Sequence, residues 1–236
     1  MAKSNGYCNI DDCPLYYEIT GNGDVIVFLH GNGGSGKEFE KNINDFKTDY
    51  CCITIDMRLQ GRSSKKTKKE LTYKLFADDV IKVLDNLNIE KFSVIGFSDG
   101  AITALYLAQK NEDRLKKMIL IGANYNVTGL KRMYVIIMKS LRLFYRMLCF
   151  IPFFKRQYKL FSLMTKYPNF TVQDLKKINI PALVMAGQYD MIKDEHTRTL
   201  AKCLDAKLEI IENQGHFWHA QKSIVLKEKV YKFLRA

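Results

Sequence analysis

A serine lies between two glycines at the junction of an apolar run and a helical pattern. Gly96, Ser98 and Gly100 follow the strand-like run 92–95 and precede the helix-forming stretch 101–108. A turn this sharp needs very small residues two positions before and two positions after the serine. It would raise the Ser98 hydroxyl above the sheet edge, at the positive end of the following helix. The pattern predicts a nucleophile, although an ordinary glycine-rich turn can carry the same five residues.

Two later strand-like runs are each followed by a residue that could activate the serine. Asp190 follows the run 182–186, and His216 follows the run 208–211. A serine hydroxyl needs a base to remove its proton, and the base needs an acid to hold its tautomer. We therefore expect Ser98, His216 and Asp190 to form a catalytic triad.

Other histidines and acids compete for these roles. His219 is the rival base, but a glycine precedes His216 in a loop, whereas His219 is expected to begin a helix. Asp194 is the alternative acid and would lie one turn into the following helix. We expect His30 to order the backbone around it, and His196 to lie on a solvated helix face.

An upstream strand runs into a glycine-rich loop. The continuous apolar run 25–29 leads into residues 30–36, whose glycines free the backbone to point its amides inward. We expect the backbone N–H groups of Asn32 and Asp99 to bind the charged oxygen of a tetrahedral intermediate. Gly31 and Asp99 are also expected to contact the substrate.

The carboxylate of Asp99 has two interpretations. It could face the acyl pocket and pair with a cationic group of the substrate, such as an α-amino group. It could instead be an acid at a helix N-terminus that satisfies free amides at the positive end of the helix dipole. Both remain open from the sequence.

The same glycine-rich loop has to be weighed against phosphate binding. Residues 31–37 fit the first seven positions of a P-loop, but Glu38 stands where a P-loop needs Ser or Thr to hold magnesium. A carboxylate at that position would repel phosphates. We therefore expect no nucleotide site, and the few scattered histidines predict no metal site.

The elements above, taken in chain order, resemble the α/β-hydrolase superfamily. The resemblance is closest to the valacyclovir hydrolase (biphenyl hydrolase-like) group, on residues 96–105 and 121–124. The chain departs from that group at Ala101, where glycine is usual, and in the insertion that follows. The resemblance implies the hydrolase fold with the triad order serine, aspartate, histidine. It also implies a reaction that needs no cofactor.

The chain suits one α/β domain with a single large core. Its 236 residues are 47% hydrophobic, and strand-like runs alternate with helical patterns, which predicts a mostly parallel sheet with helices on both faces. We expect residues 1–123 and 179–236 to form the hydrolase core and residues 124–178 to form an inserted helical lid. Residues 15–24 fit an antiparallel hairpin at the sheet edge, with its turn at 21–24.

The expected lid is strongly basic, and no Asp or Glu occurs between residues 124 and 173. Its basic residues are Lys131, Arg132, Lys139, Arg142, Arg146, Lys155, Arg156, Lys159 and Lys166. This stretch supplies most of the excess behind the net charge of +12.

Helical periodicity separates charge from apolar residues in the first part of the lid. Lys131, Lys139, Arg142 and Arg146 share one face, and Ile136, Ile137, Leu141, Phe144 and Leu148 lie around the other. Pro152 is expected to end that helix. The basic face could be a solvated lid surface, a weak contact with an anionic membrane, or an attraction for acidic substrates. The charges interrupt any membrane span, and nucleic acid is not an expected partner.

The first residues and the cysteines predict the cellular compartment of the protein. Residues 1–7 have no following apolar core, so no signal peptide is expected and the protein is predicted to be cytoplasmic. The six cysteines form no C-x-x-C pair, and we expect buried thiols.

The sequence thus predicts a serine hydrolase of small carboxylic esters or related acyl compounds. Aminopeptidase activity, carbon–carbon bond hydrolysis and acyl transfer use the same triad and remain alternatives. A non-catalytic ligand-binding or membrane-surface protein on the same fold is the rival from another class. The serine at position 98 excludes relatives that use an aspartate nucleophile. Natural substrate and oligomeric state are not predicted.

Overall fold

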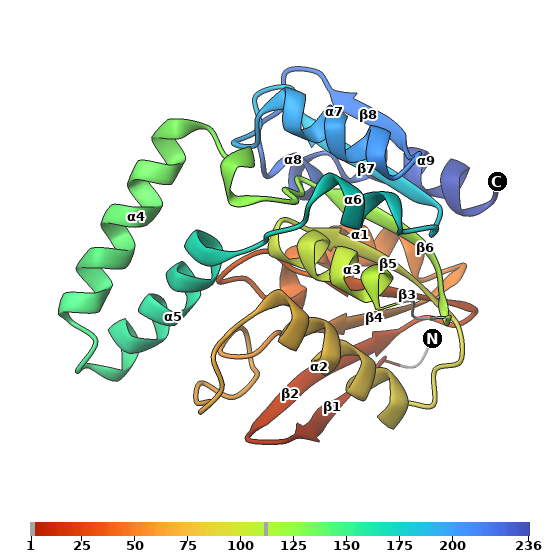
Figure 1. Ribbon diagram of the computed structural model, residues 1–236. Helices are drawn as coiled ribbons and strands as arrows, with labels where there is room; N and C mark the ends of the chain where they lie inside the picture. Colours follow the sequence, from red (N-terminus) through yellow and green to blue (C-terminus); the bar gives the residue numbers. More distant parts are fainter. Residues whose placement is uncertain (1–2, 111–112) are drawn as a thin grey trace.

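A computed structural model describes residues 3–110 and 113–236 and is built around one eight-stranded sheet (Figure 1). The strands are β1 (Lys3–Ile10), β2 (Cys13–Thr20), β3 (Asp24–Leu29), β4 (Tyr50–Ile55), β5 (Phe92–Phe97), β6 (Leu115–Ile121), β7 (Ala182–Gly187) and β8 (Lys207–Ile211). Their spatial order is β1-β2-β4-β3-β5-β6-β7-β8, with β1 and β2 antiparallel at one edge and parallel pairing from β4 onward. The predicted α/β-hydrolase fold with a mostly parallel sheet is confirmed.

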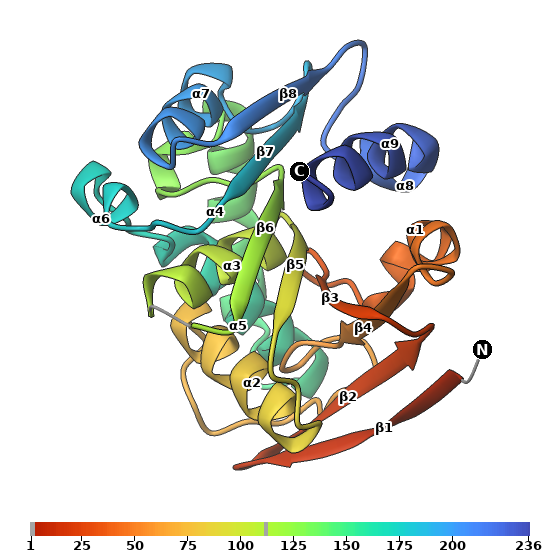
Figure 2. The same ribbon diagram turned by 90° about the vertical axis from the view of Figure 1, so that its right-hand side faces the viewer.

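Helices cover both faces of the sheet. They are the 3-10 turns η1 (Gly36–Phe39) and η2 (Val127–Gly129) and the helices α1 (Glu40–Phe46), α2 (Tyr73–Asn86), α3 (Asp99–Gln109), α4 (Arg132–Met147), α5 (Pro152–Lys166), α6 (Val172–Lys176), α7 (Asp194–Cys203), α8 (Trp218–Gln221) and α9 (Ser223–Leu234). In Figure 2, α1, α8 and α9 lie on one face of the sheet, and α2, α3 and α7 lie on the other.

Each central strand is apolar on both sides because it feeds two cores. On β3, Ile26 and Phe28 pack toward α1 and α9, whereas Val27 and Leu29 pack toward α2 and α3. Side chains alternate across a strand, so a strand buried on both faces must be a continuous apolar run. This is why β3 and β5 are readable in the sequence.

The edge hairpin forms at a different turn from the one expected. β1 and β2 pair through the turn at Asp11 and Asp12, whereas residues 21–24 carry the chain from β2 to β3. β4 lies between those two strands in the sheet. The prediction of a turn at 21–24 closing the hairpin is therefore wrong, because glycines mark a change of direction but not which strands pair afterwards.

The segment expected to form the lid contains η2, α4, α5 and α6 between β6 and β7. α4 and α5 form a helical hairpin that stands out from the body of the molecule (Figure 1). α4 ends at Met147, and Pro152 is the first residue of α5. A proline is tolerated there because the first helical amide has no partner within the helix.

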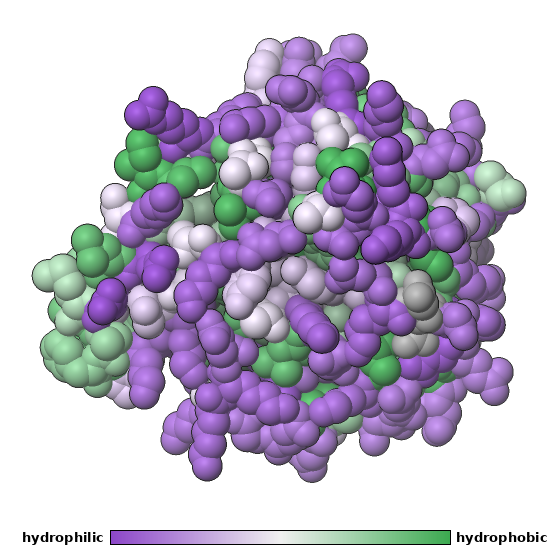
Figure 3. Space-filling view, in the orientation of Figure 1, coloured by the Kyte–Doolittle hydropathy of each residue, from purple (hydrophilic) through white to green (hydrophobic). Residues whose placement is uncertain are grey.

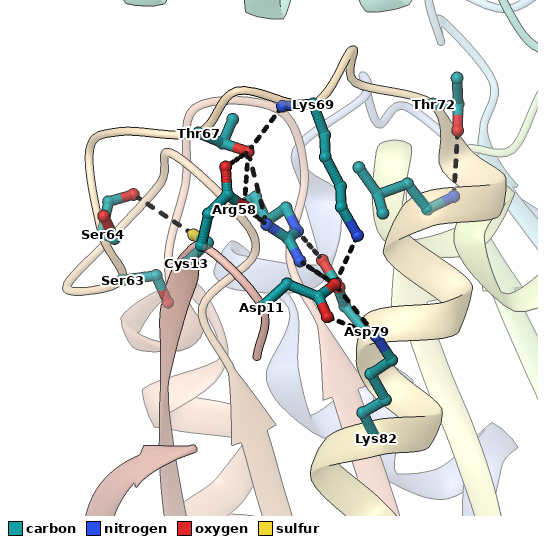
Figure 4. Close-up of polar contacts among 12 residues, drawn as sticks. Asp11, Cys13, Arg58, Ser63, Ser64, Thr67, Lys69, Thr72, Asp79 and Lys82 are labelled. Atoms are coloured by element: carbon teal, nitrogen blue, oxygen red, sulfur yellow. Dashed lines mark hydrogen bonds and ion pairs between the residues drawn. The ribbon is translucent and has the colours of Figure 1, made fainter. Parts of the chain in front are cut away.

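A buried arginine fixes the loop that follows β4. Arg58 is fully buried and donates two hydrogen bonds to Asp79 of α2, at 2.5 and 2.9 Å, and one to Asp12 at 2.9 Å. Figure 4 shows Asp11 beside this pair, in contact with Lys69 and Lys82. Burial raises the pKa of Asp79 to about 6, although Arg58 opposes that rise. The network ties the loop to α2 and to the hairpin turn.

The burial of the cysteines agrees only in part with the sequence prediction. All six cysteines are free thiols, and Cys8, Cys13 and Cys52 are buried, but Cys51, Cys149 and Cys203 are only partly buried, so the prediction of buried thiols holds for half of them. Within residues 3–110 and 113–236, no helix is long and apolar enough to cross a membrane.

Candidate active site

Ser98 is the single residue between β5 and α3. Its backbone has φ 51° and ψ −114°, a left-handed conformation that a non-glycine residue adopts at a cost. A Cβ added to Gly96 would lie 2.5 Å from the carbonyl oxygen of Gly100, and one added to Gly100 would overlap the carbonyl oxygen of Leu29. The two glycines therefore let α3 pack directly against β3, and the strained turn holds Ser98 at the sheet edge.

His216 and Asp190 are in contact at the same edge of the sheet. His216 Nδ1 lies 2.7 Å from Asp190 Oδ1, which also accepts a 3.0 Å hydrogen bond from the Ile192 amide. Both side chains are buried, although Asp190 follows β7 and His216 follows β8. The carboxyl ends of neighbouring parallel strands meet at one edge, which brings together loops far apart in the chain.

Gly122, at the end of β6, borders the imidazole of His216. Its φ is +60°, and an added Cβ would lie 2.7 Å from His216 Cε1 and 2.9 Å from Nδ1. The ring of Phe97 also packs against the imidazole, with ring centroids 4.8 Å apart. The imidazole is therefore in contact with both a glycine and an aromatic ring, which restricts its orientation.

The other candidate base and acid are placed elsewhere. The His219 ring is fully buried between Phe97 and Phe39, and neither ring nitrogen has a hydrogen-bond partner among the described residues. Burial, with a smaller contribution from the neighbouring His216, lowers the pKa of His219 to about 3. Asp194 pairs with Arg198 on an exposed part of α7.

The remaining two histidines are both structural in their contacts. His30 Nδ1 lies 2.7 Å from the Gly31 carbonyl oxygen, and its Nε2 accepts a 3.0 Å hydrogen bond from the Met57 amide. His196 is buried, stacks on Tyr125 with centroids 3.8 Å apart, and accepts a hydrogen bond from the Tyr125 amide. The prediction that His196 lies on a solvated face is wrong: burial lowers its pKa to about 4.

The glycine-rich loop is held by acceptors from two other segments. The Gly31 amide donates to Glu38 Oε2 at 2.9 Å, and the Gly33 amide donates to Gln60 Oε1 at 2.5 Å. Gln60 lies in the loop that Arg58 anchors. Among the described residues, no group accepts a hydrogen bond from the amides of Asn32 and Asp99. These two amides are thus available to an acceptor that occupies the site.

The carboxylate of Asp99 is turned into the protein. Oδ2 accepts from Asn32 Nδ2 at 2.7 Å, and Oδ1 accepts from the Tyr73 hydroxyl at 2.8 Å. Burial raises the pKa of Asp99 to about 6, and the hydrogen bonds from Asn32 and Tyr73 partly oppose that rise. Tyr73 was missed from the sequence, because nothing near it in the chain marks a partner for a residue 26 positions away.

A cavity of about 290 Å³ joins these groups. Its lining comprises Gly31, Asn32, Glu38, Phe97, Ser98, Tyr134, Ile137, Met138, Leu141, Phe161, Met164, Met191, His216 and Phe217. The structure therefore brings Ser98, His216, Asn32 and Gly31 to one cavity, with Asp190 in contact with His216. Asp99 is not among the lining residues. The α4–α5 hairpin supplies six apolar or aromatic walls.

Glu38 is the acidic residue of this lining, and the sequence did not predict its place there. One carboxylate oxygen accepts from Gly31, as described above. Burial raises the pKa of the Glu38 carboxyl, while the Gly31 amide and the nearby His216 oppose the rise and Asp99 adds to it. No Lys or Arg is among the cavity-lining residues in the described part of the chain. Glu38 is therefore the group of this lining that can contribute a negative charge.

The chain is similar in sequence to a known family of proteins. The profile of the family described as "alpha/beta hydrolase fold" matches residues 24–148, just over half of the chain. The serine hydrolase BPHL of Homo sapiens is 34% identical over 127 residues, which cover 50% of this chain and 43% of that protein. A carboxylesterase of Bacillus subtilis is 23% identical over 237 residues, covering 89% and 79%.

The same fold recurs over the whole chain among solved structures. An α/β-hydrolase enzyme from a deep-sea metagenome library, MGS-M2, superposes with a TM-score of 0.86 and 21% identity, covering 98% of both chains. At that identity the likeness concerns the fold. The chain spans less than half the length of the first curated relatives it matches.

Proposed function

Because the chain belongs to the α/β-hydrolase family, we propose that it is a serine hydrolase that cleaves small carboxylic esters through an acyl-enzyme. The observation that carries this proposal is the 2.7 Å contact between His216 Nδ1 and Asp190 Oδ1, together with the cavity that His216 and Ser98 both line. Hydrolases named carboxylesterase are among the relatives and the structural neighbours, which supports ester hydrolysis as the class of reaction.

The proposed first step is attack by the Ser98 hydroxyl on the ester carbonyl. Asp190 accepts a hydrogen bond from the His216 Nδ1–H group, which fixes the tautomer and leaves Nε2 with a free lone pair to take the proton from Ser98. His216 then gives that proton to the leaving alcohol. His216 next takes a proton from a water molecule, which attacks the acyl-enzyme, and then returns that proton to the Ser98 oxygen as the acid is released.

The oxyanion of the tetrahedral intermediate would be bound by the Asn32 and Asp99 amides. Two backbone donors and the positive end of α3 stabilise the charge that develops on the carbonyl oxygen. The Asp99 carboxylate supports this indirectly, because it holds the Asn32 side chain and so the loop that presents the Asn32 amide. A donor of this kind is typically worth on the order of 10²–10³ in turnover.

The size and lining of the cavity favour small, largely apolar acyl groups. A volume of about 290 Å³ lies at the lower end of ordinary ligand pockets. Methionine and phenylalanine walls from the α4–α5 hairpin adapt to apolar chains, and Gly31 lines the same cavity.

Esters with an α-amino group are the favoured variant of this substrate class. The observation behind it is the presence of two acidic groups near the reacting atoms, because Glu38 lines the cavity and Asp99 directly follows Ser98 in the chain. If Asp99 itself contacts the amino group, it must release Asn32 or Tyr73. Asp99→Asn should then raise the KM for an amino acid ester more than the KM for a neutral ester of equal size. Equal effects on both esters would assign Asp99 to the support of Asn32 alone.

The decisive experiment is covalent labelling with a fluorophosphonate, alongside turnover of p-nitrophenyl esters. The wild type should be labelled and active, and Ser98→Ala should lose both. Ser140→Ala, at an exposed position on α4, is the matched control and should keep both. Labelling that persists in Ser98→Ala, or a wild type that turns over esters without being labelled, would refute the assignment of the nucleophile. A wild type with neither property would favour a non-catalytic ligand-binding protein.

We also propose a reducing, cytoplasmic environment for the protein. Six free thiols, three of them only partly buried, support it, since exposed thiols oxidise readily outside such compartments.

A further inference from the structure

The helix α4 carries two apolar stripes that lie side by side. Tyr134, Ile137, Met138 and Leu141 line the cavity and so form the inner stripe. The second stripe, continued by the turn into α5, is here named the outer apolar surface. It consists of Ile136, Leu143, Phe144, Met147, Phe150 and Phe153. At 100° per residue, its α4 members fall on an arc next to the inner stripe and away from the cavity.

The outer apolar surface is uncovered in the described chain. Each of its six side chains is at least half exposed, and Phe150 is 78% exposed. Figure 3 shows hydrophobic side chains gathered at the left edge of the molecule, where Figure 1 places the turn between α4 and α5. No residue of α4 is buried. A helix that only closed the cavity would need one apolar stripe, so covering the cavity does not account for the second.

Basic side chains flank this surface. Lys139 and Arg146 are exposed on the neighbouring arc of α4, and Lys155 is exposed in the first turn of α5. Arg142, on the same arc, is partly buried and hydrogen-bonds to Thr165 of α5. Because no acid occurs between residues 124 and 173, nothing within the segment neutralises these charges.

Exposed apolar side chains beside basic ones favour an anionic bilayer over a second copy of the chain as the partner of this surface. A second copy of this chain would bring the same basic residues of two molecules together, each with a net charge of +12. An anionic bilayer instead offers apolar depth to the six side chains and negative headgroups to the lysines and arginines beside them. The 16 residues of α4 span about 24 Å, which suits a helix lying in the plane of the membrane surface.

We propose that the outer apolar surface, with Lys139, Arg146 and Lys155, docks this protein on anionic lipid bilayers. The apolar side chains enter the boundary between headgroups and acyl chains, and the basic residues contact the headgroups. Ile137 is 46% exposed and lines the cavity beside Phe144, so docking holds this side of the cavity near the lipid. The proposal concerns a surface and does not depend on the catalytic assignment.

Binding is measured by co-sedimentation of the full chain with phosphatidylcholine vesicles, with and without phosphatidylserine, at low and physiological salt. We expect binding to the anionic vesicles, weakened but retained at physiological salt because the apolar contacts are not screened. Neutral vesicles should bind at least tenfold more weakly, since each basic residue near an anionic surface contributes about fivefold, or about 1 kcal/mol.

Two pairs of variants separate charge from apolar contact. Lys139→Gln/Arg146→Gln should weaken binding to anionic vesicles about 25-fold. Lys202→Gln/Lys232→Gln removes the same charge from exposed positions on α7 and α9, and should weaken it about twofold or less.

Leu143→Gln/Met147→Gln should weaken binding at least roughly tenfold while leaving the charge unchanged. Ile224→Gln, an exposed apolar position on α9, is its control and should bind like the wild type.

Insertion is read out with a tryptophan reporter. Phe150→Trp should shift its fluorescence to the blue with anionic vesicles and be quenched by brominated lipids, against the constant background of buried Trp218. Ile224→Trp should do neither.

Three results would overturn the proposal. The first is no binding to anionic vesicles at low salt. The second is binding unaffected by Leu143→Gln/Met147→Gln, which would leave only electrostatic attraction. The third is a wild-type dimer in light scattering that dissociates in this variant while vesicles fail to bind, which would assign the surface to a second copy of the chain.

Discussion

The unpartnered imidazole of His219 makes the stability of this protein depend on pH in a way that one substitution should remove. His219 is fully buried between Phe97 and Phe39, and both ring nitrogens lack hydrogen-bond partners among the described residues. Burial lowers its pKa to about 3, from 6.5 in the unfolded chain. We predict that His219→Leu stabilises the protein at acidic pH and leaves turnover nearly unchanged.

The magnitude follows from the two pKa values. Above pH 6.5 both the folded and the unfolded protein hold His219 neutral, so the residue adds no pH dependence. Below it, only the unfolded chain takes up the proton, and folding stability falls by about 1.4 kcal/mol per pH unit until the folded pKa is reached. From pH 7 to about pH 5 the loss is about 2 kcal/mol.

A neutral imidazole without partners also costs stability at pH 7. Leaving buried polar groups unpaired costs about 1–3 kcal/mol, and His219→Leu removes that cost. The different shape of leucine fits the site less well, which costs up to about 1.5 kcal/mol. We therefore expect His219→Leu to be as stable as the wild type or slightly more stable at pH 7. The gap should widen by about 2 kcal/mol at about pH 5.

Urea unfolding of both proteins at several pH values tests this reasoning. The difference between the two free energies of unfolding isolates His219, because other buried groups such as His196 are present in both proteins and cancel. A difference that stays constant between pH 7 and pH 5 would show that His219 has a partner or is solvated. Loss of turnover in His219→Leu comparable to that in His216→Ala would move the catalytic base to His219.

Three further predictions concern single contacts. Gly122→Ala should lower kcat at least roughly tenfold with little change in KM, because its Cβ would press on the His216 ring; unchanged kinetics would show that the ring has room to move. Glu38→Gln should raise the KM of an amino acid ester by a few fold and spare a neutral ester of equal size, as for a partly exposed ion pair, and a matching rise for both esters would argue against charge recognition. Arg58→Leu should cost about 3–5 kcal/mol in urea unfolding by leaving the Asp79 carboxyl buried without its partner, and the cost should shrink in Arg58→Leu/Asp79→Leu; a cost of the single change below about 1 kcal/mol would contradict the buried pair.

Local rules were sufficient to predict the parts of the site that lie at strand ends. The glycines around Ser98 act within five residues, and strands buried on both faces are continuous apolar runs whatever the rest of the fold does. Parallel strands must end at a common edge, so residues placed after three of them, Ser98, Asp190 and His216, could be expected to lie near one another. Fold class and candidate triad therefore follow from patterns of short range.

Contacts between elements far apart in the chain were beyond those rules. Tyr73 reaches Asp99, and Glu38 and the α4–α5 hairpin enter the cavity, only because the helices dock on particular sides of the sheet. His196 looked solvated because charged residues precede it, yet its ring stacks on Tyr125, more than 60 residues away. Flanking charge describes neighbours along the chain, whereas burial depends on neighbours in space.

The α4 helix shows most clearly which features follow from the sequence and which follow from tertiary packing. Its periodicity determined that basic and apolar residues occupy different arcs, because the angle between side chains on a helix is set by the 3.6-residue turn. Which apolar arc covers the cavity and which is left exposed was decided by how the hairpin lies over the cavity, and no property of the helix alone specifies that choice. The sequence by itself thus determined the elements and the order of the reactive residues, and the tertiary structure decided their surroundings, because burial and charge environment arise only when distant segments share the same space.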